Sequence, residues 1–200
     1  LDIYNVNFMD FAVRPPKTFT IGPGGDFTTI QDGLDNAING DVLMVEPGTY
    51  NERISFNGTN CTLQSMTGAE NTIIDGGGTG SVVSMLGNGS GVINGFTIQN
   101  GAYSLGSGLK TNGWGTIEDC IFRDNVSTAD YVIFSTGGSV TVQDSYFCSN
   151  SHNTIGPDWS DGGGNTFEDD CPDAPCPGDL DNDGLIGVND ILALISGWGT

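Results

Sequence analysis

The sequence predicts an all-β fold, a parallel β-helix of about six coils, from a repeat and from the composition of its turns. Residues 116–125 (TIEDCIFRDN) realign with residues 141–150 (TVQDSYFCSN) at a spacing of 25, and residues 92–100 (VINGFTIQN) are a looser earlier copy. A fixed period of this size indicates stacked units. Each copy is a short β-rich run followed by Asn or Gly, and glycine-rich turns separate the copies. Such runs are too short for helices.

In a stack of this kind every strand pairs with the coils above and below it, and alternate side chains fill the interior. About six coils at ~4.8 Å each would be about 30 Å long. We expect Asn125 and Asn150 to form a ladder of side-chain amides at one corner. The residues expected in the interior are Val42, Met44, Ile54, Phe56, Leu63, Ile73, Val82, Phe96, Ile98, Ile117, Phe122, Val142 and Phe147.

The predicted β-helix body, residues 17–167, begins with an amphipathic helix within residues 26–38. Its apolar face would carry Ile30, Leu34, Ala37 and Ile38. A strand, a Pro-Gly-Thr-Tyr turn and further short strands follow. This order resembles the start of right-handed parallel β-helix domains of the pectin-lyase-like group, over about three quarters of the chain. The resemblance implies a right-handed coil and an N-terminal capping helix.

Residues 1–16 read as an extended arm, with Val6, Phe8, Phe11 and Val13 spaced for a strand and an Arg-Pro-Pro sequence before the body. Two interpretations stay open. The arm can lie along its own solenoid as an edge strand, or it can add to a sheet of a neighbouring subunit.

Residues 178–200 carry a pattern typical of a calcium loop. In a twelve-residue calcium loop, carboxylates and one main-chain carbonyl supply oxygen ligands, and a glycine allows the sharp turn. Residues 179–190 have carboxylates at the ligand positions and Gly184 at the turn. The predicted ligands are Asp179, Asp181, Asp183, Leu185 through its carbonyl, and Asp190. The alternative is a polar surface turn without an ion, but so many carboxylates would repel one another strongly in the absence of a cation.

This loop ends in Asp190 rather than the usual Glu and continues into the apolar run 191–195, which resembles a dockerin repeat, the calcium module of secreted bacterial proteins. Dockerins usually carry two such repeats, and one is present here. The apolar run has more residues than one buried face can use. Its partner would be the last coil of this chain or a surface on another molecule. The resemblance also implies recognition of a cohesin-like receptor through Val188 and Asn189.

Residues 168–177 form a Cys- and Pro-rich linker in which Cys171 and Cys176 could close a small disulfide loop outside the cell. Cys61 and Cys120 are expected to be buried as small apolar side chains. Cys148 has no assigned role.

The charge of the chain excludes several partners. Five basic residues face 25 acidic ones, for a formal net charge of −20. Nucleic acid is a poor partner because phosphate neutralisation needs many lysines and arginines. No apolar run is long enough to insert into a membrane. The calcium loop favours an extracellular or cell-surface location, and self-association should depend on divalent ions or salt.

The sequence shows no convincing catalytic constellation, and we do not expect an enzyme. The basic residues of the body are Arg53, Lys110 and Arg123, none in a catalytic pattern. Asp119 and Asp144 occupy matching positions on adjacent coils, as do Glu118 and Gln143, and a turn role is preferred to a glycosidase pair. Trp114 and Trp159 could stack on sugar rings or cover the ends of the core. His152 is read as a surface residue.

The leading hypothesis from the sequence is an extracellular, calcium-stabilised structural or adhesive β-solenoid that assembles with copies of itself, as a filament or surface layer, through its terminal segments. One alternative is a carbohydrate-binding or polysaccharide-degrading β-helix module. The other is a cargo module anchored to a cohesin-like receptor.

Overall fold

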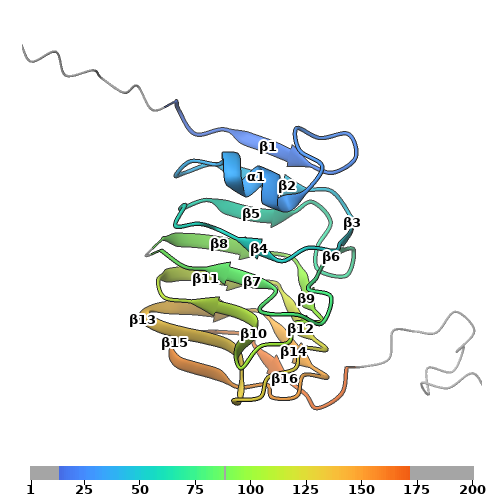
Figure 1. The fold of residues 1–200 in the computed structure, drawn as a ribbon, viewed down its shortest axis with the longest axis vertical. Helices are drawn as coiled ribbons and strands as arrows, with labels where there is room; N and C mark the ends of the chain where they lie inside the picture. Colours follow the sequence, from blue (N-terminus) through green and yellow to red (C-terminus); the bar gives the residue numbers. More distant parts are fainter. Residues whose placement is uncertain (1–13, 88, 172–200) are drawn as a thin grey trace, which may run out of the picture.

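The computed structural model describes residues 14–87 and 89–171, which form a parallel β-solenoid of about six turns with one short helix (Figure 1). The N-terminal residues of this part lie at one end of the stack and its C-terminal residues at the other. The predicted β-helix architecture is therefore confirmed. No helix in the described ranges has the length and apolar composition needed to cross a membrane.

Two sheets wind around the interior. The ten-stranded sheet consists, in spatial order, of β1 (Thr18–Ile21), β2 (Val42–Val45), β5 (Thr62–Ser65), β8 (Ser90–Asn94), β11 (Trp114–Glu118), β13 (Tyr131–Gln143), β10 (Leu105–Thr111), β7 (Val83–Met85) and β4 (Ile54–Ser55), with β15 (Ile155–Gly163) on β13. The six-stranded sheet consists of β16 (Thr166–Phe167), β14 (Tyr146–Cys148), β12 (Ile121–Arg123), β9 (Thr97–Gln99), β6 (Thr72–Asp75) and β3 (Gly48–Tyr50).

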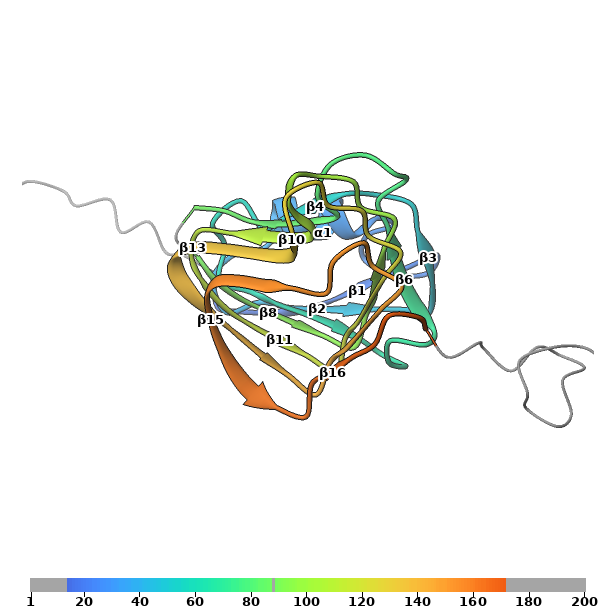
Figure 2. The ribbon, with the colours of Figure 1, turned by 90° about the horizontal axis from the view of Figure 1, so that it is seen from below.

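The long strand β13 joins two faces of the solenoid. Its first part pairs with β10 and its second part with β11, so the ten-stranded sheet turns a corner within this strand. Figure 2, which looks along the stack from the C-terminal end, shows the turns superimposed as a closed outline.

The sequence repeat corresponds to the register of the stack. Thr116 pairs with Thr141 on β11 and β13, and Phe122 pairs with Phe147 on β12 and β14. Both pairs are 25 residues apart, so one repeat is one turn of the solenoid. The predicted ladder is also present: the Asn125 side chain donates to the Asn150 Oδ1 atom at 3.1 Å.

Most of the predicted interior residues are buried, but three are wrong. Val42 and Met44 on β2 and Ile73 on β6 are only partly buried, whereas Leu43 and Ile74 have no exposed surface. Both strands have apolar residues at adjacent positions, so their apolar pattern fits either face of the strand. The inward face is set by parallel pairing with the neighbouring turns. Ten of the thirteen predicted positions are buried: Ile54, Phe56, Leu63, Val82, Phe96, Ile98, Ile117, Phe122, Val142 and Phe147.

The expected helix is present as α1 (Ile30–Asn36), shorter than predicted because Ala37 has already left helical geometry. Ile30 and Leu34 are buried as expected. Thr29 accepts a hydrogen bond from the Asp32 backbone N–H at 3.1 Å, and the Glu52 carboxylate accepts from the Ile30 N–H at 2.8 Å. These oxygens satisfy N–H groups that the first helical turn leaves unpaired.

The helix α1 contacts the edge of one strand, β4. The helix lies on the same face as β4, β7 and β10, one level nearer the N-terminal end (Figures 1 and 2). There the Gln31 side chain accepts a hydrogen bond from the Ser55 N–H at 2.7 Å and donates to the Ser55 carbonyl at 3.2 Å. The side chain thus occupies both backbone groups that β4 presents to the helix.

Candidate functional site

The predicted calcium ligands lie outside the described residues. Asp179, Asp181, Asp183, Leu185 and Asp190 all fall within residues 172–200, together with the apolar run 191–195. Within residues 14–87 and 89–171, no group of three or more His, Cys, Asp or Glu side chains is placed to hold a metal ion. The calcium loop therefore stays a prediction from the sequence.

The matched carboxylates Asp119 and Asp144 occupy a sharp turn. Their φ angles are 51° and 48°, and Gly95 takes the same place one turn earlier with φ 78°. This left-handed conformation favours Gly, Asn and Asp, so the backbone accounts for these residue types at this corner. The preferred turn role is consistent with this geometry.

The neighbouring carboxylate of Glu118 holds adjacent turns together. Its two oxygens accept hydrogen bonds from the side-chain amides of Asn94, at 3.1 Å, and Gln143, at 2.8 Å, one turn away on either side. Glu118 is thus the centre of a ladder that runs along the outside of the stack.

A second ladder uses one of the basic residues considered for catalysis. The Gln99 amide donates to the Asp75 carboxylate at 2.8 Å, and Arg123 donates to the Gln99 Oε1 atom at 2.9 Å. Burial raises the pKa of the Asp75 carboxyl, but hydrogen bonds from the Gln99 side chain, the Gly77 N–H and the Asn100 side chain, together with the charge of Arg123, hold this pKa below its usual value. Lys110 instead lies over the ring of Tyr103, 4.8 Å from its centroid.

An exposed trio superficially resembles a catalytic triad. The His152 Nε2 atom lies 3.2 Å from an Asp130 carboxylate oxygen, and Nδ1 lies 3.3 Å from the Ser151 Oγ atom. The Ser151 hydroxyl, however, accepts from the Ser127 N–H at 2.7 Å and donates to the Ser127 carbonyl at 3.2 Å. The His152 side chain is 41% exposed and the Asp130 side chain is 74% exposed, so solvent screens the electrostatic interaction between them. A serine nucleophile activated by His152 would need this interaction to be strong. The surface assignment of His152 is supported.

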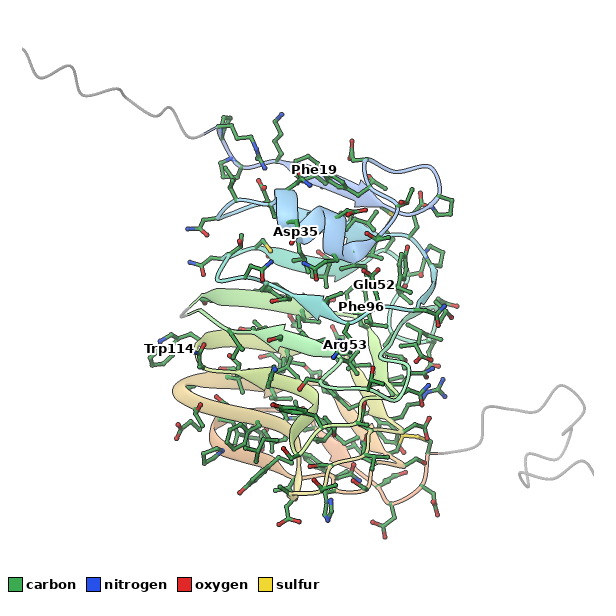
Figure 3. All side chains as sticks on the ribbon, viewed as in Figure 1. Phe19, Asp35, Glu52, Arg53, Phe96 and Trp114 are labelled. Atoms are coloured by element: carbon green, nitrogen blue, oxygen red, sulfur yellow. A yellow bond between two sulfur atoms is a disulfide. The ribbon has the colours of Figure 1, made fainter. Side chains whose placement is uncertain are left out.

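The two tryptophans have different environments. Trp114 is 59% exposed and projects from one side of the stack (Figure 3). Trp159 is half-buried and packs against the core in the last turn. Between them lies a shallow depression of about 430 Å³, also lined by Gly137, Gly138, Ser139, Pro157 and Asp158. Trp159 therefore covers the end of the core, whereas Trp114 is available for contacts.

The cysteines correct one expectation. Cys171 forms a disulfide with Cys148, not with Cys176 of the linker. Cys171 follows the last turn, and its N–H donates to the Ser149 Oγ atom at 2.9 Å, which places Cys171 beside Cys148. The two cysteines are 23 residues apart, close to one repeat, and this spacing was the available sequence signal. Cys61 and Cys120 are buried as predicted, and desolvation raises the pKa of each thiol to about 12.

The N-terminal end holds an ion pair that the sequence analysis missed. Arg14, assigned to the arm, donates to both oxygens of the fully buried Asp41 carboxylate, at 2.8 and 2.5 Å. The same carboxylate accepts from the backbone N–H groups of Lys17, at 2.8 Å, and Ile38, at 2.7 Å. Chiefly through the Arg14 hydrogen bond, the pKa of Asp41 is held well below its usual range.

The outer edge of β1 is partly covered by its own chain. The backbone N–H and carbonyl groups of Thr20 point away from β2, and the N–H donates to the Asp26 carboxylate at 2.8 Å. Its carbonyl accepts from the N–H groups of Asp26, at 2.7 Å, and Phe27, at 3.2 Å. The 22–27 loop thereby occupies backbone groups that would otherwise offer a template for another strand.

The C-terminal end of the described stack carries an exposed aromatic ring and several exposed carboxylates. The rings of Phe122, Phe147 and Phe167 are stacked, and the last of them is 44% exposed. The exposed acidic residues of this last turn are Asp158, Asp161, Glu168, Asp169 and Asp170.

Comparison of the sequence with models of protein families gives no match, and comparison with curated proteins gives none either.

Proposed function

We propose that the protein is an extracellular, calcium-stabilised structural or adhesive β-solenoid that assembles with copies of itself through its terminal segments. One observation carries this proposal. The polar side chains on the outside of the stack, among them Glu118, Asp75 and Arg123, bond neighbouring turns to one another. Groups used in this way reinforce a scaffold and are not left free for chemistry.

The location outside the cell is supported by the disulfide between Cys148 and Cys171, since such bonds persist in oxidising compartments. In this proposal the body is a right-handed β-helix with α1 as its N-terminal cap. A calcium ion would be held by Asp179, Asp181, Asp183, Asp190 and the carbonyl of Leu185, a set of hard oxygen donors suited to this cation.

Terminal segments are favoured over bare strand edges as the contacts between copies. At one end the 22–27 loop occupies the Thr20 backbone. At the other, Pro157 in β15 has no N–H to donate, and β16 has only two residues. Direct stacking of one solenoid on the next would therefore lack a backbone hydrogen bond at Pro157 and gain little along β16, whereas residues 1–16 and 178–200 supply apolar side chains.

Sedimentation of the purified protein tests this proposal. With calcium we expect species larger than a monomer, and excess EDTA should return them to monomers, because unscreened carboxylates repel one another at this net charge. Magnesium at equal ionic strength is the control for simple screening. A protein that remains monomeric with and without calcium would contradict the proposal.

A second candidate function, carbohydrate binding, is favoured by the exposed Trp114 and the depression beside it. A sugar ring could pack on the indole face while its hydroxyls bond to Asp158 and Ser139. The net charge of −20 makes a neutral glycan the better ligand.

A fluorescence titration with neutral oligosaccharides tests this second function. We expect a saturable change in tryptophan emission that Trp114→Ala abolishes and that Trp114→Phe partly preserves. A signal unaltered in Trp114→Ala would remove Trp114 from any glycan site.

A further inference from the structure

We infer that residues 191–195 of the same chain dock on the C-terminal end of the solenoid, over the exposed ring of Phe167. This inference rests on the calcium-binding part of the proposed function and does not require self-assembly. Docking of residues 191–195 on their own solenoid leaves residues 1–16 as the terminal segment for contacts between copies.

The receiving surface is the end of an aromatic column. The Phe122 and Phe147 ring centroids are 5.0 Å apart, and those of Phe147 and Phe167 are 4.8 Å apart, with interplanar angles of 7° and 12°. Phe122 and Phe147 have no exposed surface, because each is covered by the ring of the next turn. Phe167 is 44% exposed, and no described residue continues the column beyond it. The column therefore ends on an apolar face.

The backbone beside Phe167, in β16, favours coverage by side chains over addition of a strand. The Thr166 and Glu168 N–H groups donate inward, to the Ser145 and Phe147 carbonyls at 2.9 and 2.8 Å. The backbone groups of successive strand residues point to opposite sides of the strand. In the two-residue β16, only Phe167 therefore has its N–H and carbonyl facing outward. An apolar segment that covers the ring would bury surface without requiring a new ladder of hydrogen bonds.

The path of the chain selects the occupant. Cys171 is four residues beyond Phe167 and is fixed to the last turn by its disulfide with Cys148. Nineteen residues separate Cys171 from Ile191, enough to span up to about 60 Å when extended. Tethering at this length gives an effective concentration on the order of millimolar. Residues 191–195 of the same chain therefore have an advantage over those of a second copy in dilute solution.

Charge makes this docking dependent on a cation. The last turn carries five exposed carboxylates, and residues 172–200 add Asp173 to the four predicted calcium-binding aspartates, with no Lys or Arg. Two acidic surfaces of this kind repel each other. A bound calcium ion would cancel two charges and hold the segment in one conformation, so docking should appear on calcium addition.

Hydrogen exchange of the full chain tests the inference. On calcium addition we expect amides of residues 155–168 to exchange about tenfold more slowly, equally at low and high protein concentration. Leu192→Asp and Phe167→Ser should each abolish this protection, whereas Phe167→Leu should retain most of it. Leu86→Ser, at a 40% exposed apolar residue in another turn, is the matched control and should leave the protection unchanged.

Calorimetric titration of calcium on the same samples distinguishes a failure of docking from a failure of calcium binding. Calcium binding without added protection would overturn the docking and leave the calcium-binding proposal intact. Lack of calcium binding would contradict the proposed function itself. Protection that appears only at high protein concentration would show that a second copy is the occupant, and would also overturn the inference.

Discussion

At the scale of single residues, the most consequential interaction is the pair of Arg14 and Asp41. Four hydrogen bonds converge on a carboxylate without exposed surface. They join the segment before β1 to the turn before β2. A buried carboxylate is tolerated when such bonds replace those it made with water.

Asp41→Asn should lower the free energy of unfolding by about 2–4 kcal/mol, because it removes the charge and leaves Arg14 without its partner. Denaturant unfolding followed by circular dichroism measures this change. Asp124→Asn, at an exposed position with φ 55°, is the control and should differ little from the wild type. Equal stability of the two variants would contradict the role of Asp41.

The pH dependence of stability should also reflect the Arg14–Asp41 pair. Since folding lowers the pKa of Asp41, its contribution is fully present above the ordinary value of about 4 and is lost as the pH falls toward the lower folded value. Melting temperatures measured at decreasing pH should therefore fall less steeply in Asp41→Asn than in the wild type. Parallel curves would exclude this linkage.

Asn125 has a comparable role at the corner ladder. Its Oδ1 atom accepts from the Gly101 N–H at 2.8 Å, and its amide donates to the Ile98 carbonyl at 2.9 Å and to Asn150. Asn125→Ala should destabilise the fold by about 2–4 kcal/mol, since it leaves several buried hydrogen-bonding groups without a partner. Asn150→Ala, nearer the end of the stack, should cost less. The reverse order in urea unfolding would count against this view.

At the scale of elements, the sequence predicts the strands well and their inward faces less well. Residues 116–125 and 141–150 alternate clearly, and Ile117, Phe122, Val142 and Phe147 are inside as expected. In β2 and β6 apolar residues are adjacent, and only pairing with neighbouring turns selects the face. The Arg14–Asp41 pair is likewise absent from any local pattern, because 27 residues separate its members.

The disulfide is the element-scale feature with the clearest measurable effect. It closes a loop of 23 residues around the last turn, so Cys148→Ser should lower stability by about 2–4 kcal/mol. Cys61→Ser, at a buried free thiol, is a useful comparison for the chemistry of the substitution alone. Peptide mapping of the unreduced protein should find Cys148 joined to Cys171, and a Cys171–Cys176 peptide would contradict the assignment.

At the scale of the whole molecule, the 25-residue repeat is sufficient to predict a parallel solenoid, since its period equals one turn. The ends could not be predicted in the same way. Closure of β1 depends on Asp26 and Phe27 folding back onto Thr20, and exposure of Phe167 depends on where the last turn stops. Neither of these two features can be inferred from the 25-residue repeat. The calcium ligands stay a prediction from the sequence, because they lie outside the described residues.

Electron microscopy of the purified protein with and without calcium is the most direct test of a calcium-stabilised, self-assembling scaffold. Filaments or ordered layers with calcium, which disperse into single particles in excess EDTA, are the predicted result. Single particles of monomer size under both conditions would contradict it.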